Sequence, residues 1–146
     1  MTKISSAKTC EEFVSTAPKE TNTEGAEYSP LTLAYIGDAV FELLVRSHVL
    51  VADGNTQTSK LHKKSASLVC AKAQSEAYFK IQSLLSESEL RVLKRGRNAR
   101  SCSSAKSASV SDYRHSTGLE ALFGHLYLTN KHGRIKELFD IIKNKS

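Results

Sequence analysis

The chain has 146 residues, of which 40% are hydrophobic and 25% are charged, which indicates a globular rather than a disordered or fibrous protein. Its three cysteines are widely spaced and form no CxxC pair, which argues against a disulfide framework or a zinc site. The sequence has no apolar run long enough to cross a membrane and no apolar signal core at its start, so we expect a cytoplasmic protein.

The positive charge of the chain lies outside its N-terminal segment. The net charge is +6 overall, but residues 1–28 carry a net charge of −2 and residues 29–146 carry +8. A basic globular body indicates a polyanionic partner, most often a nucleic acid. Residues 1–28 are rich in Thr, Ser, Glu and Lys and are predicted to be a flexible lead-in, whereas residues 29–146 are predicted to form one domain.

The chain is predicted to be all-α, with five to seven helices, because no segment alternates apolar and polar residues as a strand does. In the first helix Ser29 can serve as the N-cap, and Pro30 fits the first helical position. The second helical region is either one helix or two helices with a bend near Cys70. The predicted helices cover residues 29–50, residues 58–84, a stretch that begins at the capping box of residues 86–89, residues 112–130 and residues 134–144.

The first predicted helix is apolar on two sides and carries an acid within one of them. Asp38 follows Gly37 in mid-helix, where glycine costs about 1 kcal/mol relative to alanine. One interpretation is a solvent-exposed ladder of ion pairs formed by Asp38, Glu42 and Arg46. The other is that a second helix approaches closely at Gly37 and leaves Asp38 in need of a partner. The first apolar face comprises Ile36, Val40, Leu43 and Leu44, and the face near Asp38 comprises Leu31, Val45 and Val49.

The helix predicted at residues 112–130 has the same arrangement of an acid beside a glycine. Glu120 points away from the core side of this helix, and Gly124 lies one turn further along on the side of Glu120. The predicted core stripe consists of Leu119, Leu122 and Leu126. We therefore expect the two helices to cross closely at their glycines and to bring Asp38 and Glu120 together.

Two carboxylates at short range repel each other unless a proton or a cation lies between them. The spacing leaves three solutions open, namely a shared proton, a basic partner such as Arg114 or Lys72, and a divalent metal ion. Mg²⁺ prefers oxygen ligands and is typically held by one or two carboxylates together with water and substrate phosphate. A metal-bound pair beside a basic surface describes a phosphodiesterase, whereas a base-neutralised pair is a structural feature.

Four segments, in the expected order along the chain, resemble motifs of the ribonuclease III catalytic domain. Residues 33–42 (LAYIGDAVFE) and 119–124 (LEALFG) are similar to the Leu-Gly-Asp-Ala-Val and Glu-Ala-Leu-Ile-Gly motifs of that family. Residues 61–66 (LHKKSA) and 93–100 (LKRGRNAR) resemble, more narrowly, the bacterial short form called Mini-III. That form consists of the catalytic domain without a double-stranded RNA-binding domain. The resemblance covers about residues 29–140.

This resemblance implies an all-helical, homodimeric endonuclease that cuts double-stranded RNA with Mg²⁺. For the short form it also implies maturation of both ends of the large-subunit (23S) ribosomal RNA precursor, assisted by a ribosomal protein. Asp38 and Glu120 would be the catalytic residues and the metal ligands. Tyr35 stands where larger members carry an aromatic residue that inserts into the partner subunit, which implies a place in the dimer interface.

The sequence departs from the full-length members at two acidic positions. Those members have glutamate four residues before the motif aspartate, where this chain has Ala34. They have aspartate three residues before the second-motif glutamate, where this chain has Thr117. The short form shares such losses, so the resemblance still implies activity and leaves open whether one or two metal ions bind.

Without an RNA-binding domain, the catalytic body itself must hold the duplex. Double-stranded RNA is recognised through its shape, its phosphates and its 2′-hydroxyl groups, which requires basic side chains spread over a surface. The candidates are Lys60, Lys63, Lys64, Lys94, Arg95, Arg97, Arg100 and Lys106, the last in a Ser/Ala-rich loop at residues 98–111. His62 and His115 lack metal-ligand spacing and are expected at the surface.

Two other functions remain open from the sequence. A catalytically silent RNA-binding or ribosome-associated protein with the same fold would have no need of an acid pair, so the presence of both Asp38 and Glu120 favours an enzyme. A helical DNA-binding regulator would need a helix-turn-helix motif, and the sequence shows no clear one.

Overall fold

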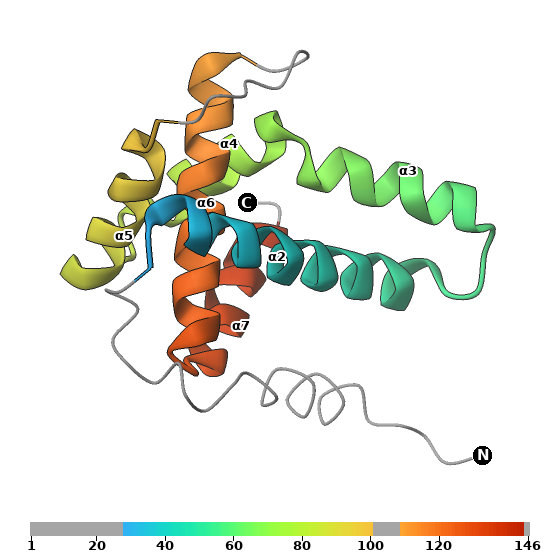
Figure 1. The fold of residues 1–146 in the computed structure, drawn as a ribbon. Coiled ribbons are helices and arrows are strands. Elements are labelled where there is room, and N and C mark those ends of the chain that lie inside the picture. Colours follow the sequence, from blue (N-terminus) through green and yellow to red (C-terminus); the bar gives the residue numbers. More distant parts are fainter. Residues whose placement is uncertain (1–27, 101–108, 145–146) are drawn as a thin grey trace.

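The computed structural model describes residues 28–100 and 109–144, and within these ranges every regular element is a helix (Figure 1). The predicted all-α class is therefore confirmed. The predicted lead-in lies outside the described residues except for Tyr28. No helix in the described ranges is long and apolar enough to cross a membrane. The helices are α2 (Pro30–Asp53), α3 (Thr58–Val69), α4 (Ala71–Gln82), α5 (Glu87–Asn98), α6 (Val110–Leu128) and α7 (His132–Lys143).

The helix ends follow local signals in the sequence. The Ser29 side chain accepts a hydrogen bond from the Thr32 amide, as expected for the N-cap of α2. Cys70 has an extended backbone, with φ −63° and ψ 156°, so the second helical region is indeed two helices. The capping box before α5 is present in full. α6 begins earlier than predicted, because Ser109 rather than Asp112 is its N-cap, and α7 begins at His132 rather than at residue 134.

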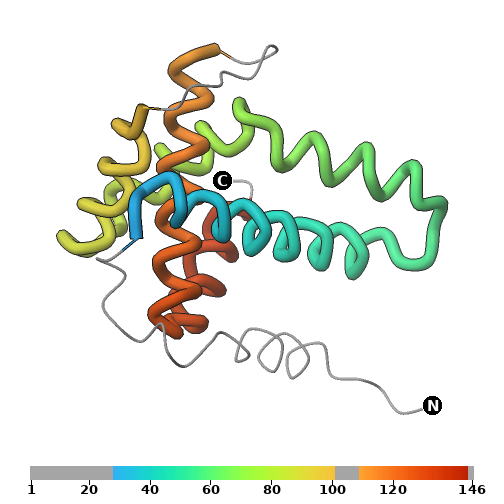
Figure 2. Tube along the Cα trace, in the orientation of Figure 1, coloured from blue at the N-terminus to red at the C-terminus, as the bar shows by residue number. Residues whose placement is uncertain are grey.

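α6 is the central helix of the molecule. In Figures 1 and 2 it runs through the middle of the fold, with α2 crossing it on one side and α4, α5 and α7 packed around it. Its buried residues point in every direction around the helix axis, so the predicted stripe of three leucines describes only part of what it buries. Besides those leucines, the buried residues of α6 are Ser116, Thr117, Gly118, Ala121, Phe123, Gly124, His125 and Leu128.

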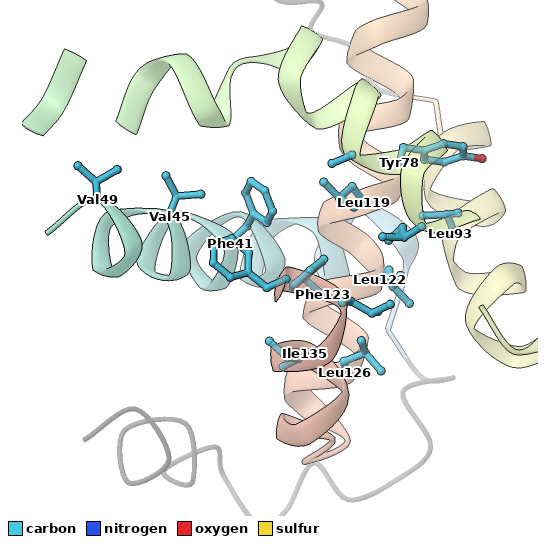
Figure 3. Packing of buried hydrophobic residues seen from close by; sticks show 14 residues of the cluster. Phe41, Val45, Val49, Tyr78, Leu93, Leu119, Leu122, Phe123, Leu126 and Ile135 are labelled. Atoms are coloured by element: carbon cyan, nitrogen blue, oxygen red, sulfur yellow. The ribbon is translucent and has the colours of Figure 1, made fainter. Parts of the chain in front are cut away.

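The largest apolar cluster joins α2, α4, α5 and α7 to α6 (Figure 3). Phe41 of α2 lies at its centre and is 1% exposed. Its ring meets Phe123 edge-on at a centroid distance of 5.4 Å and Phe139 at 6.1 Å. A smaller cluster lies at the start of α2 and consists of Leu33, Ala34, Ala121 and Leu128. α2 is thus fixed to α6 by apolar packing at two places.

Of the two apolar faces predicted for α2, the second is the more deeply buried. On the first face Leu43 is 41% exposed, and the other three members are only partly buried. On the second face Val45 and Val49 are buried, and Leu31 is 40% exposed. The buried residues of the helix are Leu33, Ala34, Gly37, Phe41, Val45 and Val49. A hydrophobic pattern gives little weight to glycine and alanine, yet these small residues mark the side on which another backbone comes closest.

Candidate active site

α2 and α6 cross with their backbones in contact. A Cβ atom added at Gly37 would overlap the carbonyl oxygen of Glu120, and one added at Gly124 would overlap the carbonyl oxygen of Leu33. Neither position can therefore hold a side chain while the helices keep their separation. This crossing confirms the close approach that the two mid-helix glycines predict.

The crossing brings Asp38 and Glu120 within electrostatic reach of each other. Glu120 is half-buried, and burial first and the charge of Asp38 second raise the pKa of its carboxyl to about 8, even though a hydrogen bond from Gln74 acts in the opposite direction. Asp38 is exposed, and its pKa is raised by partial desolvation and then by Glu42. Asp38 ionises first, while Glu120 still holds its proton, so repulsion within the pair falls on Glu120.

No base neutralises the pair. Among the described residues, no ion pair joins Asp38 or Glu120 to a lysine or arginine, and no cation lowers the pKa of either acid. Arg114, one of the two predicted basic partners, instead lines a hollow beside Arg97. The structural alternative of an acid pair neutralised by Arg114 or Lys72 is therefore not what this fold contains.

The ladder of ion pairs on α2 forms only in part. Arg46 Nε lies 2.8 Å from a carboxylate oxygen of Glu42, one turn away on the same helix. Asp38 is not part of this pair, and its electrostatic neighbour on α2 is the like-charged Glu42. Asp38 therefore stays available for a ligand.

Gln74 is a site residue that no motif or spacing in the sequence had singled out. It lies on α4 and is 2% exposed, and its side-chain amide acts to lower the pKa of Glu120. The only hint in the sequence is the spacing: Gln74 lies three positions before Ala77 and so falls on the same, buried side of α4. That signal does not specify a partner, because the contact depends on how α4 packs against α6.

The two positions that depart from the full-length family contribute no carboxylate. Ala34 is 6% exposed and belongs to the smaller apolar cluster. Thr117 is buried, and its hydroxyl donates to the backbone carbonyl of Tyr113 at 3.0 Å. In the described part of the chain, no group of three or more His, Cys, Asp and Glu side chains could hold a metal ion. The site thus offers two carboxylates, which is within the usual number for Mg²⁺ when water and phosphate complete the shell.

The predicted RNA-binding residues lie on two helices. Lys60, Lys63 and Lys64 are exposed on α3, and Lys64 is paired with Asp53 at 2.6 Å. On α5 the side chains of Lys94 and Arg95 are exposed, and Arg100 is exposed just beyond the helix. Arg97 is partly buried and donates to the Tyr78 hydroxyl at 3.3 Å. Lys106 lies outside the described residues.

A hollow at the junction of α5 and α6 gathers basic and polar groups. Its lining consists of Arg97, Asn98, Val110, Ser111, Arg114 and His115. His115 is not a surface residue as predicted but is half-buried, with its ring centroid 4.6 Å from those of both Tyr78 and Phe79. His62 is exposed, as expected. Tyr35 is 80% exposed, the most exposed of the large hydrophobic side chains in the described ranges.

Comparison with known proteins identifies relatives that share most of the length of this chain. The sequence profile of the family described as "Ribonuclease III domain" matches residues 31–131. The chain is 46% identical over 118 residues to a Mini-ribonuclease 3 of Clostridium tetani, covering 81% of this chain and 78% of that protein. It is 47% identical over 122 residues to a Mini-ribonuclease 3 of Brevibacillus brevis, covering 81% and 90%.

A solved structure agrees with this assignment. The crystal structure of a Fusobacterium nucleatum protein superposes with a TM-score of 0.72 at 35% sequence identity, covering 80% of this chain and 92% of that one. The matched range of the family profile contains α2 from its second residue through α6, and with them both acids and both crossing glycines. The chain belongs to the ribonuclease III domain family.

Proposed function

We propose that the α2–α6 crossing is the active site of a Mg²⁺-dependent endoribonuclease that cleaves double-stranded RNA. The chain is an endoribonuclease of the ribonuclease III type, as its family and its relatives named Mini-ribonuclease 3 indicate. The observation that carries the proposed site is the acid pair itself. Two carboxyl groups with raised pKa values and no basic partner in the described ranges are a poor structural feature but a suitable cation site.

Asp38 and Glu120 would hold the cation between them. The proton that Glu120 retains up to a pKa of about 8 marks the place where positive charge is needed, and this proton would be lost on binding. A bound Mg²⁺ supplies charge stabilisation at the phosphoryl group and activation of a water nucleophile. Asp38 is exposed and half-buried Glu120 lies behind it, so Asp38 is the acid that faces the RNA.

Duplex RNA would be held by basic side chains on α3 and α5 and around the hollow. Lys60, Lys63, Lys94, Arg95 and Arg100 are exposed and suited to phosphate contacts. Arg97 and Arg114 face one hollow together, which suits a single phosphate group. Lys64 is a weaker candidate, because Asp53 already balances its charge. Lys106 remains a candidate from its sequence alone.

The substrate and the assembly follow from the family resemblance. We infer a role in maturing the 5′ and 3′ ends of the 23S ribosomal RNA precursor in the cytoplasm, with a large-subunit ribosomal protein as a helper. We also infer a homodimer with Tyr35 at its interface. An 80% exposed tyrosine between the exposed Leu31 and Leu43 on α2 supports a protein contact there.

The alternative of a catalytically silent RNA-binding protein with this fold is less well supported. A protein that only binds RNA gains nothing from an acid whose pKa is raised to about 8 inside a basic domain. Burial of such a group disfavours its charged form, and a bound cation would offset this cost.

The test is cleavage of a structured ribosomal RNA precursor with Mg²⁺ by the wild-type chain, Asp38→Asn and Glu120→Gln. Each substitution is expected to lower kcat by about 100-fold or more, because charge stabilisation of the transition state is lost. Asp140→Asn, a surface acid paired with Lys143, is the matched control and should keep full activity. Cutting at the wild-type rate by both variants would remove this active site, and inactivity of the wild type would favour the silent protein.

A further inference from the structure

The hollow between the C-terminal end of α5 and the start of α6 is a basic cavity. Its volume is about 420 Å³, and among the described residues its lining includes Arg97 and Arg114 but no acid. Neither arginine forms an ion pair within the described ranges. Two guanidinium groups at one concave site without a counter-charge favour an anion there, and the planar fork of arginine matches the geometry of a phosphate group.

Contacts with α4 fix the wall of this hollow. Arg97 Nη1 donates to the Tyr78 hydroxyl at 3.3 Å, and Arg97 Nε donates to Asn98 Oδ1 at 3.1 Å. His115 Nδ1 lies 3.3 Å from the Ser75 hydroxyl oxygen, and the His115 ring centroid lies 4.6 Å from that of Tyr78. The side chains of Arg97 and His115 are therefore already ordered, which lowers the entropic cost of binding a ligand.

An exposed aromatic ring lies beside the hollow. Phe79 of α4 is 58% exposed, and its ring centroid lies 4.6 Å from that of His115 in the lining. Val110, also in the lining, is 60% exposed. The bases of a duplex are stacked on one another, so an exposed protein ring stacks with unpaired bases. Apolar surface next to two arginines thus fits a nucleotide, which brings a base as well as a phosphate.

The size and shape of the hollow also favour a whole nucleotide over a phosphate group alone. Pockets that hold small organic ligands measure about 300–1,000 Å³, and the volume of about 420 Å³ lies within this range. A concave site admits a nucleotide that has left the helix. The phosphates of an intact duplex lie on its outside and are contacted by exposed side chains such as Lys94 and Arg95.

We propose that this hollow binds an unpaired nucleotide of the RNA, an inference that rests on the RNA-binding function proposed above. Arg97 and Arg114 contact the phosphate of this nucleotide, and its base stacks on Phe79. Arg114 precedes Glu120 by six residues on the same helix, a rise of about 9 Å, so one RNA molecule can occupy the hollow and the proposed active site together. The substrate class is therefore a duplex that continues into single-stranded RNA.

The test compares two RNA duplexes of equal strand length and equal charge. One is fully paired, and the other is forked, with two unpaired adenosines at every strand end. Binding to the full chain is measured by fluorescence anisotropy with Ca²⁺ in place of Mg²⁺. The wild type should bind the forked duplex about 10-fold more tightly, because one base stacked on an aromatic ring contributes a free energy of that size.

Two variants examine the two parts of the site. Arg114→Gln removes a phosphate contact, and Phe79→Leu removes the stacking surface but keeps an apolar side chain. Each should bring the ratio of the two affinities close to one, while most of the affinity for the paired duplex is kept. Retained binding of the paired duplex, together with thermal melting, verifies that each variant is folded.

Lys94→Gln is the matched control, because Lys94 is exposed on α5 and lies outside the lining of the hollow. It removes one positive charge, as Arg114→Gln does. It should weaken binding of both duplexes by a similar factor and leave their ratio at the wild-type value.

The outcomes separate this inference from the proposed function. Equal binding of the two duplexes by the wild type would overturn the role of the hollow. So would a preference that survives in both Arg114→Gln and Phe79→Leu, or one that is lost equally in Lys94→Gln. Failure of the proposed function would be recognised differently, because the wild type would then bind neither duplex.

Discussion

Burial and the nearby charge of Asp38 raise the pKa of the Glu120 carboxyl group well above that of a glutamate in water. A pKa of about 8 means that the metal-free folded chain carries a proton there at neutral pH, whereas the unfolded chain does not. A raised pKa of an acid in the folded state makes folding less favourable as pH rises from the unfolded value towards the folded one. Glu120, proposed as a metal ligand, therefore lowers the free energy of unfolding of the metal-free protein at neutral pH.

The first prediction concerns the stability of the metal-free protein. Between pH 4.5 and about 8 the native state binds more protons at Glu120 than the unfolded state does, so the free energy of unfolding should fall across this window. Glu120→Gln cannot ionise, and it should remove this part of the pH dependence and melt higher than the wild type at pH 8 in EDTA. Thermal melts at several pH values measure both effects.

Asp140→Asn is the control for this prediction, since Asp140 is a surface acid paired with Lys143. It should leave the slope of stability against pH nearly unchanged in this window. Added Mg²⁺ should stabilise the wild type by about 2.7 kcal/mol when its concentration is 100 times Kd, and it should stabilise Glu120→Gln less. A Glu120→Gln variant with the wild-type slope would show that this carboxyl is not the group responsible.

At the level of elements, the crossing of α2 and α6 decides where the acids meet. The carbonyl of Glu120 itself lies against Gly37, so the backbone contact and the acid pair are the same piece of structure. Any residue that forces the two helices apart also moves Glu120 away from Asp38. Packing and chemistry cannot be altered independently here.

The second prediction follows from this contact. Gly37→Ala should destabilise the fold by about 3 kcal/mol, because the added methyl group overlaps backbone rather than a flexible side chain. It should also lower kcat of any folded fraction, since the acids separate. Chemical denaturation and cleavage assays measure the two effects.

Gly133→Ala is the matched control, since Gly133 is also helical and nothing lies within 4 Å of an added Cβ. There alanine should be neutral or stabilising by up to about 1 kcal/mol. Equal stability of Gly37→Ala and Gly133→Ala would contradict the backbone contact.

Much of this level could be predicted from the sequence. Ser29, Pro30 and the capping box at residues 86–89 give helix ends through local hydrogen bonds, and these were found. The paired glycines predicted the crossing because glycine destabilises the middle of a helix, and a close backbone contact offsets that cost. The sequence did not predict which of the two apolar faces of α2 is the more deeply buried, or that Gln74 of α4 influences Glu120. Both depend on how the helices pack against one another. Periodicity shows that a helix buries a face but does not show the small residues at a crossing.

At the scale of the whole molecule, most of the proposed RNA-binding groups and the proposed catalytic acids lie on different helices. Most of the proposed RNA-binding side chains lie on α3 and α5, whereas the two acids of the proposed site lie on α2 and α6. Many of the basic groups are exposed and form no ion pair within the described ranges, whereas Lys64 is paired with Asp53. Residues that lack an internal counter-charge are the ones that can exchange counterions for RNA phosphates.

The third prediction is a difference in salt dependence between two lysines. Lys94→Gln should weaken binding to double-stranded RNA and reduce the slope of log affinity against log salt concentration by about 1. Lys64→Gln should change this slope less, because Asp53 already neutralises that side chain. Fluorescence anisotropy in Ca²⁺ at several salt concentrations provides the measurement. A larger change for Lys64→Gln would reverse the assignment of the two lysines.

The central position of α6 has a consequence for how the molecule opens. From Ser116 to Leu126 α6 is buried at nearly every position and cannot detach while its neighbours stay folded, so the amide hydrogens of this stretch should exchange with solvent only through global unfolding. α3, of which only Ser65 is buried, should instead exchange through smaller local openings. Deuterium uptake would then be slowest around Glu120, and the lifetime of an intact reaction centre would equal the lifetime of the folded chain.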